Sequence, residues 1–119
     1  MTNQWRCVIN SQELTDIILQ NLDDRKAEQI AAYDVRGISG LTDFYVIASA
    51  TSTPHLQALS ASLEREVKTK AQMTARVSGD AESAWIVVDF GDVIAHIFLP
   101  EAREYYDIEE LWRNPPVEK

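Results

Sequence analysis

The sequence predicts a single mixed α/β (α+β) domain in which helices pack on a five-stranded sheet. Helical and strand-like patterns follow in the order α, β, β, α, β, β, β, α, and the last two strands flank a Gly-Asp turn. The 119 residues suit one domain, and 45% hydrophobic with 25% charged residues is typical of a globular chain. We expect a flexible N-terminus over residues 1–10, the domain over 11–113 and a flexible tail over 114–119.

The first three elements are an amphipathic helix and two strands. Ser11 is a candidate N-cap, and apolar residues at helical spacing after it predict a helix over 11–22. Residues 30–36 are expected to form a short strand. Residues 43–50 form an almost continuous apolar run, so we expect a strand that is covered on both faces.

The next helix has a clear start in the sequence. Thr53 can act as its N-cap, and Pro54 fits the first helical position, where a missing N–H costs nothing. Leucines at helical spacing continue the pattern to about Lys70. A short third strand is expected over 74–78, stopped by Gly79–Asp80.

Two apolar runs, 84–90 and 93–99, predict a hairpin whose turn is Gly91–Asp92, with the glycine at the first central position. After Pro100 the sequence predicts a helix over 101–112, either continuous or in two short pieces around Asp107.

The predicted turn also sets which side chains share a face of the hairpin. It places Trp85 opposite Phe98 and Val87 opposite His96. Since side chains alternate along a strand, Trp85 and His96 are expected on the same face of the sheet.

The polar residues of the hairpin allow more than one interpretation. Asp89 and Asp92 could hold a metal or act as an acid–base pair, but turn residues that bond the local backbone are the commoner case. His96 is more often a core histidine than a ligand, and neither histidine of the chain pairs with a cysteine or histidine at ligand spacing. Trp85 fits the core or a binding hot spot. The loop ASATSTPH lacks a phosphate-loop pattern, and we expect His55 to be exposed and incidental.

The net charge of −8 bears on the class of partner. Arg65, Lys68 and Lys70 are mixed with Glu64 and Glu66, so no separate basic patch is visible and little direct nucleic-acid binding is expected. A basic protein partner would be attracted instead. The same charge could simply keep the domain in solution.

Few features of the sequence indicate a cellular compartment. Cys7 is the single cysteine, so no internal disulfide can form. No apolar run approaches the roughly 20 residues that span a bilayer, and no export signal is visible. We therefore expect no membrane association and a cytoplasmic protein.

Three stretches of the sequence resemble the ribosomal silencing factor family, also called Iojap-like: LTDFYVIASATSTPHLQAL, AWIVVDFGDVIAHIF and EAREYYDIEELW. The second stretch matches the family pattern W-x-x-x-D-x-G-D-x-x-x-H, and the third matches R-x-x-Y-x-x-E-x-L-W. The sequence departs from the family at Ser78, where glutamate is usual, and at Pro54, where arginine is frequent.

The resemblance implies a fold similar to a nucleotidyltransferase core, but without catalysis, cofactor or metal. It implies binding to the large ribosomal subunit through its protein fourteen, which blocks subunit joining and represses translation. Trp85 is then expected to be an exposed anchor. The residues that the resemblance suggests for partner binding are Trp85, Asp43, Asp89, Asp92, His96, Arg103 and Tyr106.

Two other functions stay open at this point. A metal-dependent, nucleotidyltransferase-like enzyme would need Asp43, Asp89 and Asp92 to converge beside a pocket. A homodimer would pair the same apolar and aromatic surface with a second copy of the chain.

Overall fold

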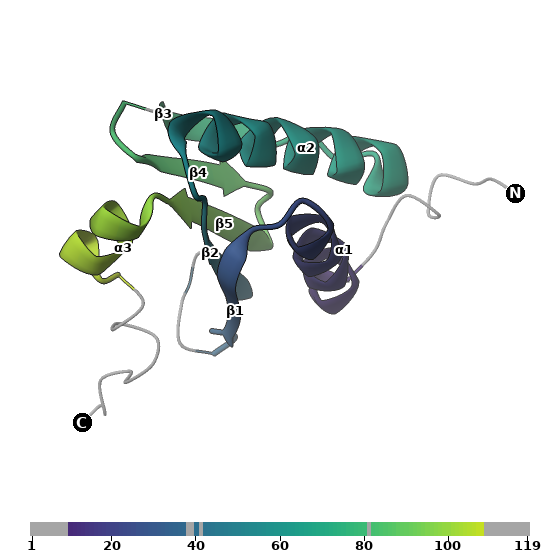
Figure 1. Cartoon of the computed structure of the whole chain (residues 1–119). Coiled ribbons are helices and arrows are strands. Elements are labelled where there is room, and N and C mark those ends of the chain that lie inside the picture. Colours follow the sequence, from purple (N-terminus) through teal and green to yellow (C-terminus); the bar gives the residue numbers. More distant parts are fainter. Residues whose placement is uncertain (1–9, 38–39, 41, 81, 109–119) are drawn as a thin grey trace, which may run out of the picture.

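The computed structural model describes residues 10–37, 40, 42–80 and 82–108, and in this part the expected order of elements is confirmed (Figure 1). The elements are α1 (Ser11–Asp24), β1 (Glu28–Asp34), β2 (Phe44–Ser49), α2 (Thr53–Ala71), β3 (Arg76–Asp80), β4 (Trp85–Asp89), β5 (Val93–Phe98) and α3 (Pro100–Tyr106).

The five strands form one mixed sheet in the order β1-β2-β5-β4-β3. β2 and β5 are parallel, and the other neighbours are antiparallel. β2 is buried along its whole length, as its apolar run predicted. Helices α1 and α2 cover one face of the sheet, whereas α3 lies at one end of the other face (Figure 1). That second face is therefore covered only in part by the described helices.

Both predicted helix caps are wrong by one residue. Asn10, not Ser11, caps α1: its side chain accepts from the Glu13 N–H at 2.8 Å, and the Glu13 carboxylate accepts from the Asn10 N–H at 3.0 Å. Ser52, not Thr53, caps α2 by accepting from the backbone N–H three residues later. In each case an extended residue just before the first helical turn brings its side-chain oxygen within reach of a free N–H.

Gly79 does not stop β3 as predicted, because β3 runs through Asp80. Gly79 has a φ of +81°, and a Cβ at this position would collide with the carbonyl oxygen of Trp85 on β4. The glycine therefore permits a close approach of the two strands instead of ending one of them.

The remaining bounds differ from expectation for local reasons. β1 begins earlier than predicted, at Glu28, and contains an irregularity in which Gln29 has a φ of +50°. α3 ends at Tyr106, and its C-cap, Asp107, adopts a left-handed conformation with φ +46°, so the predicted break at Asp107 is confirmed. The continuation of the predicted helix over 109–112 lies outside the described residues, as do residues 1–9 and the tail. None of the described helices is long and apolar enough to cross a membrane.

Candidate partner-binding surface

The hairpin of β4 and β5 has the predicted register. Trp85 lies opposite Phe98 and Val87 opposite His96, and the Phe90 N–H donates to the Val93 carbonyl at 2.9 Å. Gly91 has a φ of +92°, as its place in the two-residue turn requires. Trp85 and His96 therefore share one face of the sheet, as the sequence predicted.

Trp85 is half-buried, so the expectation that its side chain is exposed is wrong. Its indole N–H donates to Nδ1 of His96 at 3.1 Å. Its ring stacks on Phe98 with centroids 5.0 Å apart and contacts Tyr106 of α3 at 4.8 Å. The turn of the chain into α3 places Tyr106 against the indole, which sequence spacing could not reveal.

His96 is a core histidine, with 8% of its surface exposed. Burial lowers its pKa to about 4, although the nearby Asp89 carboxylate acts in the opposite direction. Because Nδ1 accepts the indole hydrogen bond, the neutral ring carries its proton on Nε2. The ring lies between Tyr45 and Trp85, with centroids 5.6 and 5.9 Å away.

Arg103 connects α3 to the edge of the sheet. Its Nη1 donates to the Gln29 carbonyl at 2.7 Å and to the Ser49 hydroxyl at 2.9 Å. The backbone irregularity at Gln29 is thus tied to α3 across 74 positions of sequence. This contact gives Arg103 a structural role beside the partner contact that the family resemblance suggests.

Asp43, Asp89 and Asp92 take part in local hydrogen bonds of the hairpin turn and of the start of β2. The Asp89 carboxylate accepts from the Gly91 N–H at 2.7 Å, which is the local bond expected of a turn residue. The Asp92 carbonyl accepts from the N–H groups of Asp43 at 2.9 Å and Phe44 at 3.2 Å, joining the hairpin turn to β2. Among the described residues no group of three His, Cys, Asp or Glu side chains could hold a metal ion, so the enzyme alternative is not supported.

His55 is not incidental, contrary to expectation. Its Nδ1 accepts from the Thr51 N–H at 2.9 Å, and its Nε2 donates to the Arg25 carbonyl at 2.9 Å. The ring therefore connects the start of α2 to the C-cap of α1, a role that only the packing of the two helices creates.

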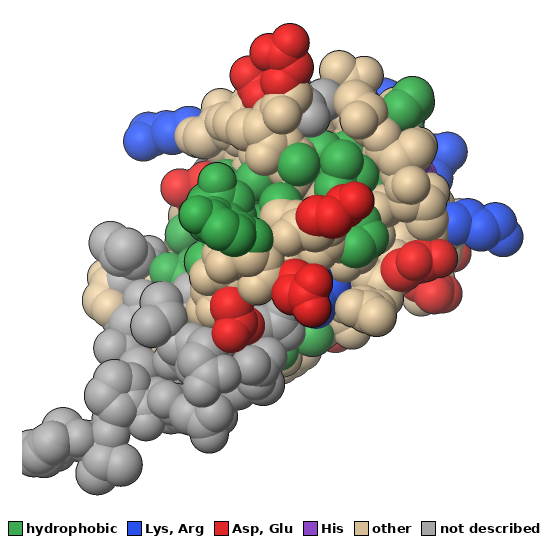
Figure 2. Space-filling model, turned by 60° about the vertical axis from the view of Figure 1, so that its left-hand side comes forward, with side chains coloured by type: hydrophobic (Ala, Val, Ile, Leu, Met, Phe, Trp, Pro, Cys, Tyr) green, Lys and Arg blue, Asp and Glu red, His purple; other side chains and the backbone are tan. Residues whose placement is uncertain are grey.

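An exposed aromatic group lies on α3. Tyr105 and Tyr106 are 81% and 46% exposed, and their rings meet edge to face at 5.1 Å. Together with Trp85 they form what we call the aromatic surface. Carboxylates of Glu101, Glu104 and Asp107 are exposed on or just after the same helix. Figure 2, turned toward the side where α3 lies in Figure 1, shows exposed hydrophobic side chains with Asp and Glu side chains among them.

Sequence reasoning missed Tyr105. The spacing of residues in α3 could have indicated it. Ala102 and Tyr106 are four residues apart and face the sheet, so Tyr105 points outward with Glu101, which is four residues before it. As partner contacts, all seven residues that the resemblance suggests remain predictions: Trp85, Asp43, Asp89, Asp92, His96, Arg103 and Tyr106.

The fold and this surface are those of a small mixed α/β domain with an exposed aromatic face. The sequence profile of a family described as "Ribosomal silencing factor during starvation" matches residues 8–119. The chain belongs to the ribosomal silencing factor family, and membership supports a role in ribosome-associated silencing.

Individual relatives agree with this assignment. The ribosomal silencing factor of Halalkalibacterium halodurans is 33% identical over 109 residues, which cover 92% of this chain and 93% of the relative. Mouse "Mitochondrial assembly of ribosomal large subunit protein 1" is 33% identical over 100 residues, covering 82% of this chain and 44% of the relative. A crystal structure of a Chromobacterium violaceum protein matches with a TM-score of 0.83 at 29% identity and covers 92% of both chains. The more specific likeness to a nucleotidyltransferase core stays a prediction.

Proposed function

We propose that the protein binds the large ribosomal subunit through its protein fourteen, blocks joining of the small subunit and so represses translation in the cytoplasm. The mechanism is steric and involves no catalysis. Family membership supports a large-subunit partner, and one relative is named for assembly of that subunit. The observation that carries the proposal is the aromatic surface, whose two tyrosines are exposed beside a tryptophan held in place by His96.

The composition of this surface suits a basic protein partner. Tyrosine and tryptophan are enriched in binding hot spots because they bury much area at little cost in conformational entropy. The carboxylates of Glu101, Glu104 and Asp107 stand beside the rings, and the whole chain carries −8. Such an arrangement accelerates encounter with a basic surface and disfavours acidic partners.

Sedimentation of the purified protein with dissociated ribosomal subunits tests the proposal. The wild type should travel with the large subunit, and Tyr105→Ala/Tyr106→Ala should lose most of that binding. Val77→Ala is the matched control, because Val77 is an exposed hydrophobic side chain (42%) on β3, outside α3. If the wild type stays unbound, the proposal is wrong. If the double variant binds as well as the control, the contact lies elsewhere on the protein.

Self-association of the aromatic surface would compete with ribosome binding. Light scattering over a range of concentrations separates the two: a homodimer through this surface would show a mass that rises with concentration in the wild type but not in Tyr105→Ala/Tyr106→Ala.

A further inference from the structure

The irregularity in β1 presents a backbone carbonyl to α3. Between Glu28 and Ala31 this strand carries one more residue than the facing part of β2, as in a β-bulge. Gln29, within the bulge, has a φ of +50°, and its carbonyl accepts from Nη1 of Arg103 at 2.7 Å. A left-handed backbone is unfavourable for a residue with a Cβ, so contacts around it must hold it in place. The bond from Arg103 is one such contact.

The same nitrogen atom of Arg103 binds a second acceptor. Nη1 also donates to the hydroxyl of Ser49 at 2.9 Å. Ser49 lies at the end of β2, opposite Phe98 of β5, and its side chain is buried. The two bonds use both hydrogens of Nη1, so this atom has none left to donate to another molecule. We call Arg103, the Gln29 carbonyl and the Ser49 hydroxyl the α3 clamp.

The position of α3 depends strongly on such tertiary contacts. The helix has seven residues, and among its described side chains only that of Ala102 is buried. Tyr106 packs on Trp85 with ring centroids 4.8 Å apart, yet it stays 46% exposed. Because helices this short are not stable in isolation, the clamp contributes to where α3 lies on the sheet.

We propose that the α3 clamp positions the aromatic surface for its protein partner, with Arg103 as the positioning residue. Tyr105 and Tyr106 follow Arg103 by two and three positions in the same short helix, so a displacement of Arg103 moves both rings. Rings that are held in place before the partner arrives lose less conformational entropy on binding. Arg103 thus acts through α3 and not by touching the partner. This inference rests on the proposed function, which assigns partner binding to the aromatic surface.

Ser49→Ala gives the sharpest test, because a side chain that is 2% exposed cannot contact a partner. The variant removes an acceptor of Arg103 and should weaken the affinity for dissociated large subunits several-fold, with the amount bound at saturation unchanged. A purely structural defect would instead lower the fraction of protein that can bind. Ser60→Ala, which changes a buried serine of α2, is the matched control and should bind as the wild type. Equal affinities of the two variants, or a loss of binding capacity alone, would overturn the proposal.

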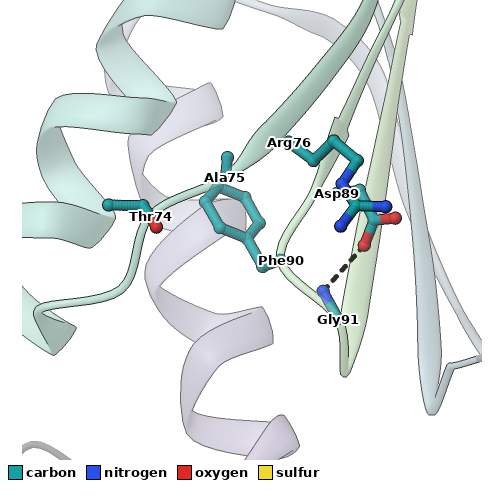
Figure 3. A pocket seen from close by; sticks show the side chains of 6 residues that line it. All are labelled: Thr74, Ala75, Arg76, Asp89, Phe90 and Gly91. Carbon is teal, nitrogen blue, oxygen red and sulfur yellow. Dashed lines mark hydrogen bonds between the residues drawn. The ribbon is translucent and has the colours of Figure 1, made fainter.

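A double-mutant cycle distinguishes positioning from direct contact. Arg103→Leu and Ser49→Ala/Arg103→Leu should have equal affinities, because the hydroxyl has already lost its donor in the single variant. Arg76→Leu is the control. Arg76 pairs with Asp89, at the opposite end of β4 from Trp85, where it lines an open hollow (Figure 3), so its effect should add to that of Ser49→Ala. Additive effects of the Ser49 and Arg103 changes would show that Arg103 contacts the partner independently and would refute the proposal.

A third measurement needs no ribosome and so separates failure of the clamp from failure of the proposed function. The indole N–H of Trp85, one of three tryptophans, gives an NMR resonance that Trp85→Phe identifies. In Arg103→Leu this resonance should shift because the adjacent Tyr106 ring moves, whereas Arg76→Leu should leave it in place. An unmoved resonance in Arg103→Leu would refute the clamp. A shifted resonance together with a wild type that does not bind large subunits would support the clamp and refute the proposed function.

Discussion

Trp85 and His96 are joined across the β4–β5 hairpin by a hydrogen bond from the indole N–H to Nδ1, 3.1 Å long. The bond orients the indole that Tyr106 packs against, and it requires an unprotonated Nδ1. Protonation of Nδ1 of His96 would place a second N–H donor against the indole N–H of Trp85 and so break this hydrogen bond. The aromatic surface therefore depends on the charge state of a buried imidazole.

Stability should consequently fall as pH is lowered. The pKa of His96 is about 4 in the folded protein, below its ordinary 6.5, so the folded state binds fewer protons between these values. The contribution of neutral His96 to the free energy of unfolding is fully present above about pH 6.5 and is lost as the pH falls toward 4. The free energy of unfolding decreases by about 3 kcal/mol over this range. Urea unfolding at several pH values measures this. His96→Gln should show a flatter profile in the same window, and an unchanged profile would contradict the assignment.

The contacts of Arg103 predict a local effect on α3. Arg103→Leu removes the bonds to the Gln29 carbonyl and the Ser49 hydroxyl, and should destabilise the protein by about 2 kcal/mol. Amide hydrogen exchange in α3 should rise more than in α2. Arg36→Leu, which breaks an exposed ion pair, is the control and should change the unfolding free energy little. Equal effects of the two changes would argue against a structural role for Arg103.

Two glycines of positive φ should respond differently to alanine. Gly91→Ala meets no atom within 4 Å, so its cost is the conformational strain of about 1 kcal/mol. Gly79→Ala adds a collision with the Trp85 carbonyl and should cost at least 2 kcal/mol more, because β3 must move from β4. Chemical denaturation measures the free energy of unfolding of both variants. Similar losses in the two variants would show that β3 can move away from β4 at little cost.

The acidic residues of α3 should govern the rate of encounter with the large subunit. Glu101→Lys/Glu104→Lys should lower the association rate several-fold at low salt while changing dissociation much less. Asp23→Lys/Asp24→Lys changes the net charge equally at the end of α1, away from α3, and is the control. Surface plasmon resonance at two salt concentrations measures both rates, and a change confined to dissociation would place these carboxylates inside the contact.

Local rules were sufficient for much of this fold. The hairpin register followed from a two-residue Gly-Asp turn and the alternation of side chains, so the shared face of Trp85 and His96 was predictable. The caps were off by one residue because Asn10 and Ser11, like Ser52 and Thr53, are adjacent residues that can all act as caps. Choosing between them depends on backbone angles that composition does not specify.

The sequence by itself determined the order of the elements, the buried central strand, the hairpin pairing and the family, because each follows from periodicity or from a contiguous motif. Tertiary structure alone decided that Tyr106 covers Trp85, that Arg103 holds the Gln29 carbonyl and that the His55 ring joins the start of α2 to the Arg25 carbonyl. These contacts join residues far apart in sequence or on different elements. They depend on how helices settle on a sheet, which spacing along one chain does not encode.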